Sequence, residues 1–227
     1  GSYTYAHGQD NGPAPFDLGR GGNYPQNPFN ISSEYASSDT DLRHHFVASQ
    51  IIELPVGRGK RFLTHASGLV DDVLGGWQLN SITTLQTGKP INVVSNANQP
   101  DYPGLRPNLV ASTSLPHRST KEWFNTKAFS IPSGQAASVE AGKTLIVGDA
   151  GRNIVYGPGY SNEDLSLFKV LTLPREMKFQ MRFEAFNLLN IAHYDNPVGN
   201  YAAGSQFGEI LGGYNPRVMQ FAGRLTF

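Results

Sequence analysis

A short run of polar residues near residue 40 is the part of the sequence where neighbouring side chains could do chemistry. Asp41, Arg43 and His45 are spaced two residues apart. In an extended strand this spacing sends side chains to the same face. An acid, a guanidinium and an imidazole on one face could act in proton transfer. Structural ion pairing is the simpler interpretation, so we predict a polar cluster there rather than a catalytic centre.

Metal-binding patterns are weak throughout the sequence. His44 and His45 are adjacent, so in a strand they face opposite sides and cannot chelate one ion together. The stretch SSDTD (37–41) and the pair Asp71–Asp72 lack the ligand spacing of a calcium loop. Cysteine is absent, which excludes disulfides, thiolate ligands and a cysteine nucleophile. We expect no metal site and no cofactor.

Enzyme motifs are missing as well. The stretches GRGK (57–60) and TGK (87–89) have neither the spacing nor the following Ser or Thr of a phosphate loop. The sequence contains no G-x-S-x-G elbow and no H-E-x-x-H zinc motif. The sequence therefore predicts a protein that is not an enzyme.

Composition narrows the remaining classes. Lys+Arg and Asp+Glu both number 18, so no basic surface for nucleic acid is expected. Charged residues make up 16% of the 227 residues, and Gly and Pro number 25 and 15, which favours many turns. No apolar run approaches the roughly 18 residues of a membrane-spanning helix, and GSYTYAHGQD (1–10) lacks the features of a signal peptide.

Strand patterns dominate the chain. Alternating apolar and polar residues are typical of strands with two different faces. The segments KFQMRFEAF and WQLNSITTLQ show this alternation plainly, and EDLSLFKVL puts Leu165, Leu167 and Leu171 on one side with Lys169 as the misfit. One short helix or turn is predicted over 65–76. The six expected strands cover residues 2–7, 43–54, 77–86, 163–171, 178–186 and 216–227.

The connections between these strands are sorted by length. Taken as an antiparallel series, they span about 35, 20, 70, 6 and 25 residues, so the first, third and fifth lie at the same end of the sheet. Transmembrane β-barrels have long extracellular loops and short periplasmic turns on alternate ends. A soluble antiparallel sheet with one solvated face also alternates, but it has no reason to sort its loops. We therefore predict an all-β fold of antiparallel up-and-down strands, part of a transmembrane β-barrel with long extracellular loops.

The long loops also contain candidate ligand contacts. Tyr24, Tyr102 and Tyr214 lie in Asn-, Tyr- and Pro-rich stretches, which offer hydrogen bonds and aromatic platforms for a glycan, peptide or chelate. Ordinary loop composition is the alternative explanation. Trp123 is a fourth candidate contact. The apolar stretch KEWFNTKAF (121–129) that contains it also predicts a small local core formed by Trp123, Phe124 and Phe129.

Several blocks, in this order and spacing, resemble the C-terminal part of TonB-dependent outer-membrane receptors. The similarity is to the group with a carboxypeptidase-regulatory-like domain before the plug, and it covers nearly the whole chain. The blocks are YTYAHGQDNG (3–12), the segment 37–63, LGGWQLNSITTLQTGKPINV (74–93), WFNTKAF (123–129), GRNIVYGPGYSNEDLSLFK (151–169), RFEAFNLLNIAHYDNP (182–197) and NPRVMQFAGRLTF (215–227).

The resemblance implies a 22-stranded barrel with an N-terminal plug, powered by TonB, in the bacterial outer membrane. The polar cluster of Asp41, Arg43 and His45 would then face the lumen. Phe221, Leu225 and Phe227 of the closing strand would form the signal that the barrel-assembly machinery recognises. The implied partners are outer-membrane lipid, this machinery, an imported nutrient, and TonB acting through an N-terminal part.

The chain departs from that family in having about six expected strands and no recognisable plug or TonB-binding segment. We therefore expect residues 1–227 to be an incomplete C-terminal barrel segment of a nutrient importer. The alternative is a freestanding soluble or self-assembling β protein with a binding or structural role. Its exposed sheet edges would then favour strand-to-strand self-association.

Overall fold

The long strands form a single antiparallel sheet. The structure is a computed structural model that describes residues 1–12, 25–27, 29–95, 104–135 and 145–227. The sheet order is β1–β4–β5–β10–β11–β14, so each long strand pairs with the next one along the chain. This up-and-down arrangement confirms the predicted fold class. The strands span Ser2–Tyr5 (β1), His44–Glu53 (β4), Trp77–Gln86 (β5), Tyr160–Thr172 (β10), Lys178–Phe186 (β11) and Val218–Thr226 (β14).

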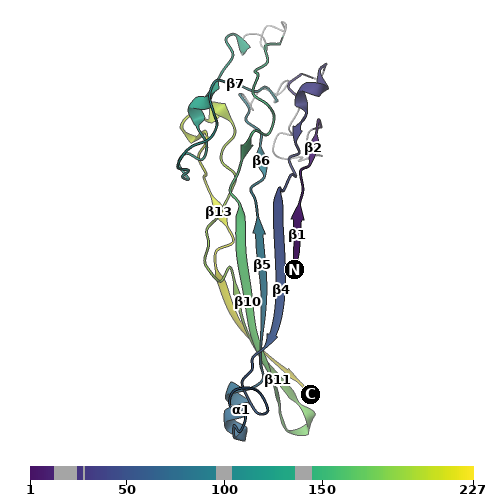
Figure 1. Ribbon diagram of the computed structural model, residues 1–227. Coiled ribbons are helices and arrows are strands. Elements are labelled where there is room, and N and C mark those ends of the chain that lie inside the picture. The colour runs from purple at the N-terminus through teal and green to yellow at the C-terminus, as the bar shows by residue number, and fades with distance from the viewer. Residues whose placement is uncertain (13–24, 28, 96–103, 136–144) are drawn as a thin grey trace.

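The two ends of the sheet differ as the loop lengths predict (Figure 1). The three long connections lie together at one end. At the other end are the C-terminus, the helix α1 (Gly68–Leu74) and a tight turn containing the 3-10 helix η3 (Pro174–Glu176). The expected helix over 65–76 is therefore present, although it is only seven residues long.

We refer to the described parts of residues 6–43, 87–159 and 187–217 as the cap. The cap contains short two-stranded sheets and single-turn helices rather than long regular elements. The paired strands are β2 (Gln9–Asp10) with β3 (Ala36–Ser37), β6 (Pro90–Ile91) with β9 (Val155–Tyr156), β7 (Asn108–Leu109) with β8 (Phe129–Ser130), and β12 (His193–Tyr194) with β13 (Gly213–Tyr214). The 3-10 helices are η1 (Ile31–Glu34), η2 (Thr126–Ala128) and η4 (Tyr201–Gln206).

The buried apolar core lies in the cap and not on the sheet. Phe124, Phe129 and Phe207 meet edge to face, with ring centroids 5.2–5.8 Å apart. Val93 and Ala128 are fully buried beside them, and Trp123 packs against the cluster. The predicted local core around residues 123–129 is thus confirmed. It also draws in Phe207 from the last connection, which the sequence did not indicate.

Several strand boundaries differ from the prediction by one to three residues. β10 begins at Tyr160 rather than at 163, because Tyr160 and Asn162 pair with Gln86 and Thr84 of β5. Backbone pairing does not require apolar side chains, so the polar start of this strand hid its true beginning. β1 ends at Tyr5, two residues earlier than expected.

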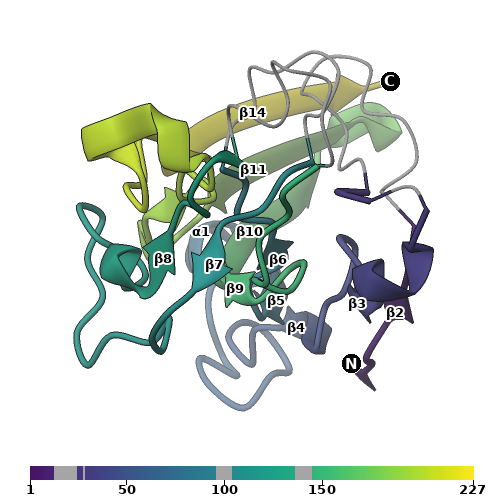
Figure 2. The ribbon, with the colours of Figure 1, turned by 90° about the horizontal axis from the view of Figure 1, so that it is seen from above.

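Seen from above, β14, β11, β10, β5 and β4 follow one another along an arc (Figure 2). The arc has the shape of part of a barrel wall, but the sheet does not close on itself. Within the described part of the chain, β1 and β14 each have a neighbour on one side only.

Candidate functional site

The strand register gives the sheet one apolar and one polar face. On one face Leu167 lies between Leu79 and Phe183, and Phe183 in turn lies opposite Phe221. The Phe183 and Phe221 rings are 4.7 Å apart. We call this the outer face. Such a surface, broad and largely apolar, is suited to lipid.

The opposite face, which we call the inner face, carries the charged and amide side chains of β11 and β14. Arg182 forms an ion pair of 3.7 Å with Glu184, and Gln220 donates a hydrogen bond to the same carboxylate. Gln180 lies opposite Arg224 in the register. These five residues therefore share one face of the sheet.

Lys169, the misfit of the strand pattern, lies on the outer face, where the cation has local partners. Its ammonium donates hydrogen bonds to the backbone carbonyls of Asp71 and Gly75 and lies 5.8 Å from the centre of the Trp77 ring. The side chain is 3% exposed. These contacts explain how a cation is accommodated between Leu167 and Leu171 on the outer face of β10.

The structure brings together only two members of the predicted Asp41–Arg43–His45 cluster. The Arg43 guanidinium lies 3.4 Å from the Asp41 carboxylate. Asp41 also accepts a hydrogen bond from the backbone amide of Gly8. Both residues precede β4, which begins at His44, so the alternation used for the prediction does not extend to them. Among the described residues, no hydrogen bond or ion pair links His45 to either one.

Two buried arginines hold the cap together. Arg106 and Glu34 form an ion pair of 2.5 Å, with side chains only 2% and 3% exposed. Arg106 also donates to the carbonyl of Ala150 at 2.8 Å. Arg152 forms ion pairs with Asp10 and Asp39. These pairs join the first long connection to the third, so charges far apart in the sequence stabilise one unit.

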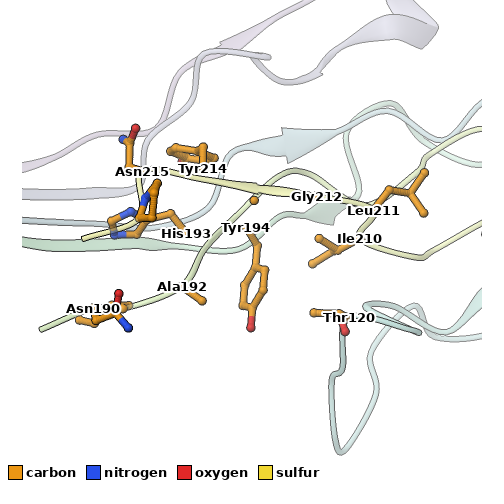
Figure 3. A pocket seen from close by; sticks show the side chains of 13 residues that line it. Thr120, Asn190, Ala192, His193, Tyr194, Ile210, Leu211, Gly212, Tyr214 and Asn215 are labelled. Carbon is orange, nitrogen blue, oxygen red and sulfur yellow. The ribbon is translucent and has the colours of Figure 1, made fainter. Parts of the chain in front are cut away.

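A concave region lies where the cap meets the upper end of the sheet. A cavity of about 560 Å³ is lined by Thr120, Asn190, His193, Tyr194 and Tyr214, together with neighbouring residues (Figure 3). In this view Thr120 approaches from a separate segment of the chain. Thr120 belongs to the third connection and Tyr214 to the fifth, so the cavity forms only when these two connections pack together.

A second cavity, of about 530 Å³, adjoins the first and shares Tyr194 and Tyr214 with it. Its walls include Lys89 and Asp195. Gln86 also lines it and is on the inner face of the sheet, so this cavity opens at the top of the polar face. It combines a cation, an anion and aromatic rings.

Three aromatic side chains cluster beside these cavities. The His193 ring is 4.3 Å from that of Tyr160, and the Tyr160 and Tyr214 rings are 6.3 Å apart and nearly parallel. His193 Nε2 donates to the carbonyl of Ser161 at 2.9 Å, which leaves Nδ1 as an acceptor in the neutral ring. In the described part of the chain this buried Nδ1 has no hydrogen-bond partner.

Burial raises the pKa of the Tyr214 phenol, and the nearby Tyr160 and Asp195 raise it further. The phenol is therefore a hydrogen-bond donor at neutral pH. Close approach of the two backbones positions it: a Cβ added at Gly213 would lie 2.6 Å from the backbone carbonyl oxygen of His193. A glycine at this point lets β12 and β13 pair tightly.

Of the four predicted loop contacts, Tyr214 is the one that the structure places at these cavities. Tyr24 and Tyr102 lie outside the described residues. Trp123 packs on the cap core, donates its indole N–H to the carbonyl of Tyr156, and has the Arg118 guanidinium 5.4 Å from its ring centre. Its main contacts are therefore within the cap.

Sequence reasoning missed the other cavity residues, notably Tyr160, His193, Lys89 and Asp195. His193 was one of several scattered histidines, and Lys89 belonged to a rejected phosphate-loop pattern. Lys89 and Tyr160 lie three residues from the ends of predicted strands, whereas His193 and Asp195 lie seven and nine residues beyond the predicted strand 178–186. Residues at strand ends on the same side of a sheet meet in space, so this position was the available clue.

The last strand and the residue after it expose the three side chains of the predicted assembly signal. Phe221 and Leu225 are 62% and 51% exposed on the outer face, and Phe227, which follows the strand, is 98% exposed. Their recognition by the assembly machinery stays a prediction.

Two further properties of the described residues bear on function. They contain no group of three or more His, Cys, Asp or Glu side chains placed to hold a metal ion. No helix among them has the length and apolar character required to cross a membrane.

The curved meander, its two unlike faces and its sorted loops define the class as the wall of a transmembrane β-barrel. A family described as an outer membrane beta barrel domain matches residues 1–220, nearly the whole chain. The chain belongs to this family. No curated protein and no solved structure matches it. The family places the protein in the bacterial outer membrane. Of the two classes that the sequence left open, it supports the outer-membrane barrel and not the soluble β protein.

Proposed function

We propose that this chain forms part of the barrel wall and the extracellular cap of a TonB-dependent receptor that imports a nutrient. The long loops of outer-membrane barrels face the cell exterior, so the cap would be the first part of the protein to meet a ligand. The family membership supports the barrel, and the blocks of sequence similarity support the receptor.

The observation that carries the proposal is the position of the second cavity. It lies at the top of the inner face, lined by Lys89, Asp195 and Tyr214. A ligand held there would be next to the polar face that leads down the sheet, along Asp164, Arg182 and Glu184. Ligand capture above a polar lumen is what an importer requires.

The chemistry of the cavity suggests the kind of ligand. Aromatic rings offer flat apolar surface, while phenol, ammonium and carboxylate groups provide both hydrogen-bond donors and acceptors. Glycans, peptides and organic chelates all combine such surfaces. In this proposal the site binds and does not catalyse.

The remaining partners follow from the same proposal. Within the barrel, β1 and β14 would pair with further strands, because an unpaired edge is not tolerated in hydrocarbon. The outer face would contact lipid, the closing strand would bind the barrel-assembly machinery, and TonB would act through a part of the receptor outside this chain.

Depletion of nutrients from the medium tests the proposal even while the ligand is unidentified. Cells carrying the wild-type gene, a deletion, or Tyr214→Ala would be grown in a complex medium whose components are followed by mass spectrometry. We expect at least one component to be depleted by the wild type, but not by the deletion or by wild-type cells treated with a protonophore. Tyr214→Ala should deplete it more slowly.

Tyr35→Ala is a matched control, because Tyr35 is an exposed cap tyrosine that does not line either cavity. It should leave depletion unchanged. Identical depletion by the wild type and the deletion would refute import. Depletion that resists the protonophore would refute TonB dependence and leave passive diffusion through the barrel.

A further inference from the structure

The connection between β4 and β5 projects apolar side chains at the end of the sheet opposite the cap. In α1, Leu69 is 83% exposed and Val73 is 64% exposed, with Val70 and Leu74 also uncovered. At 3.6 residues per turn these four residues occupy one side of the helix, and Asp71 and Asp72 lie on the other. A helix with this distribution is amphipathic, but the apolar side is the one without a protein partner among the described residues.

Two side chains of the outer face bind α1 and so determine where it lies. Lys169 and Trp77 are directly opposite each other in the register of β10 and β5, so both project from the outer face. Lys169 donates to the carbonyl of Asp71 at 3.1 Å and to that of Gly75. The Trp77 indole donates to the carbonyl of Val73 at 2.9 Å. Hence α1 is attached on the lipid side of the barrel wall and not beneath its lumen.

The rest of the connection holds the helix in this place. The Asp71 carboxylate accepts a hydrogen bond of 2.5 Å from the backbone amide of Arg58. This bond links the preceding turn to the helix. Phe62 and Leu63 of that turn are also 54% and 45% exposed. The exposed apolar side chains of α1 and of its own turn therefore lie in one connection, at the end of the sheet opposite the cap (Figure 1).

We propose that α1 is an interfacial helix that lies in the periplasmic leaflet of the outer membrane, with Leu69, Val70, Val73 and Leu74 inserted between phospholipid headgroups and acyl chains. Phospholipid is the occupant because the outer face to which α1 is attached is the lipid-facing surface of the barrel. Amphipathic helices bind at this boundary with their apolar side buried. In this position Lys169 can reach backbone carbonyls at the rim and avoid the hydrocarbon core. The helix fixes the depth of the barrel in the membrane, independently of what the receptor binds.

Site-directed fluorescence in liposomes tests this inference. The chain has no cysteine, so within it Leu69→Cys and Val73→Cys each provide a single labelling site, and any cysteine outside these residues would be replaced by serine. The full-length protein would be labelled with an environment-sensitive dye and reconstituted into phosphatidylethanolamine–phosphatidylglycerol vesicles that contain nitroxide lipids. Asp72→Cys, on the polar side of the same helix, is the matched control.

We expect the dyes at residues 69 and 73 to be quenched by acyl-chain nitroxides at least about twofold more strongly than the dye at residue 72, as for a helix embedded on one side. Equal quenching at the three positions would overturn the inference. Blue-shifted dyes at residues 69 and 73 that resist lipid quenching would overturn it too, because they would show that a protein covers the helix. Retained heat-modifiable migration of each labelled variant confirms that the barrel is folded.

Discussion

Breaking the buried ion pair of the cap by Glu34→Ala should release the first long connection from the third. Glu34 and Arg106 are almost inaccessible to solvent, so the substitution leaves a buried guanidinium with no counter-charge. Removing one partner of a buried pair typically costs about 3–5 kcal/mol. The remaining hydrogen bond from Arg106 to the carbonyl of Ala150 does not replace the lost charge.

Hydrogen exchange measured by mass spectrometry on the reconstituted protein reports the loss of cap stability in Glu34→Ala. If the cap opens locally, a cost of about 3–5 kcal/mol corresponds to exchange that is about 10²- to 4 × 10³-fold faster. The acceleration should appear in peptides around residues 29–37 and 104–110 and be absent from β10 and β11. Since the sheet does not contain the pair, its protection is an internal reference.

Two controls separate the buried charge from a general effect of mutation. Lys121→Ala removes a partner of Glu209, but Lys121 is 84% exposed, so the cost should stay within about 1 kcal/mol. The double variant Glu34→Leu/Arg106→Met removes both charges and should recover most of the protection. If Glu34→Ala exchanges within about tenfold of the wild type, the reasoning is wrong and the pair is not what holds the cap.

Three further perturbations have clear expectations. Partial burial raises the pKa of Asp10, but hydrogen bonds from Ser38 and Arg152 and the Arg152 charge outweigh it, so this pKa lies below its usual value. The ionised carboxylate therefore stabilises the cap fully above about pH 4, and this stabilisation is lost as the pH falls further. Proteolysis of the cap should increase with acid in the wild type, and Asp10→Asn should lack this acid dependence. Lys169→Met removes the charged donor to α1, which contributes about 1.5–3 kcal/mol. A nitroxide attached at Asp72→Cys should then become more mobile in spin-label spectra. An unchanged spectrum would contradict the attachment of α1 through Lys169. Phe227→Ala should reduce the fraction of barrel that reaches the membrane severalfold in fractionation experiments, whereas Thr226→Ala should not.

The sequence predicted the sheet well because a membrane barrel wall repeats one rule. Each strand must offer an apolar side to lipid and a polar side to the lumen, and this requirement is local to each strand. β5 and β11 were therefore predicted with both boundaries correct. The loop lengths supplied the topology, since antiparallel neighbours place alternate connections at opposite ends.

The cap was much less predictable. Glu34 and Arg106 are separated by 72 residues, and a charged residue that will be buried looks the same in the sequence as one on the surface. Only folding shows that they pair. The same holds for Phe207, whose place in the core depends on the last connection returning to the third.

Lys169 shows where the two sources of information meet. The sequence alone identified it as the exception on an apolar strand face. The tertiary structure explains it, because the backbone carbonyls at the end of α1 and the Trp77 ring meet at that point. Local alternation determined which side of each strand faces lipid, while the cavities, the cap and the position of α1 were decided by long-range contacts that alternation does not encode.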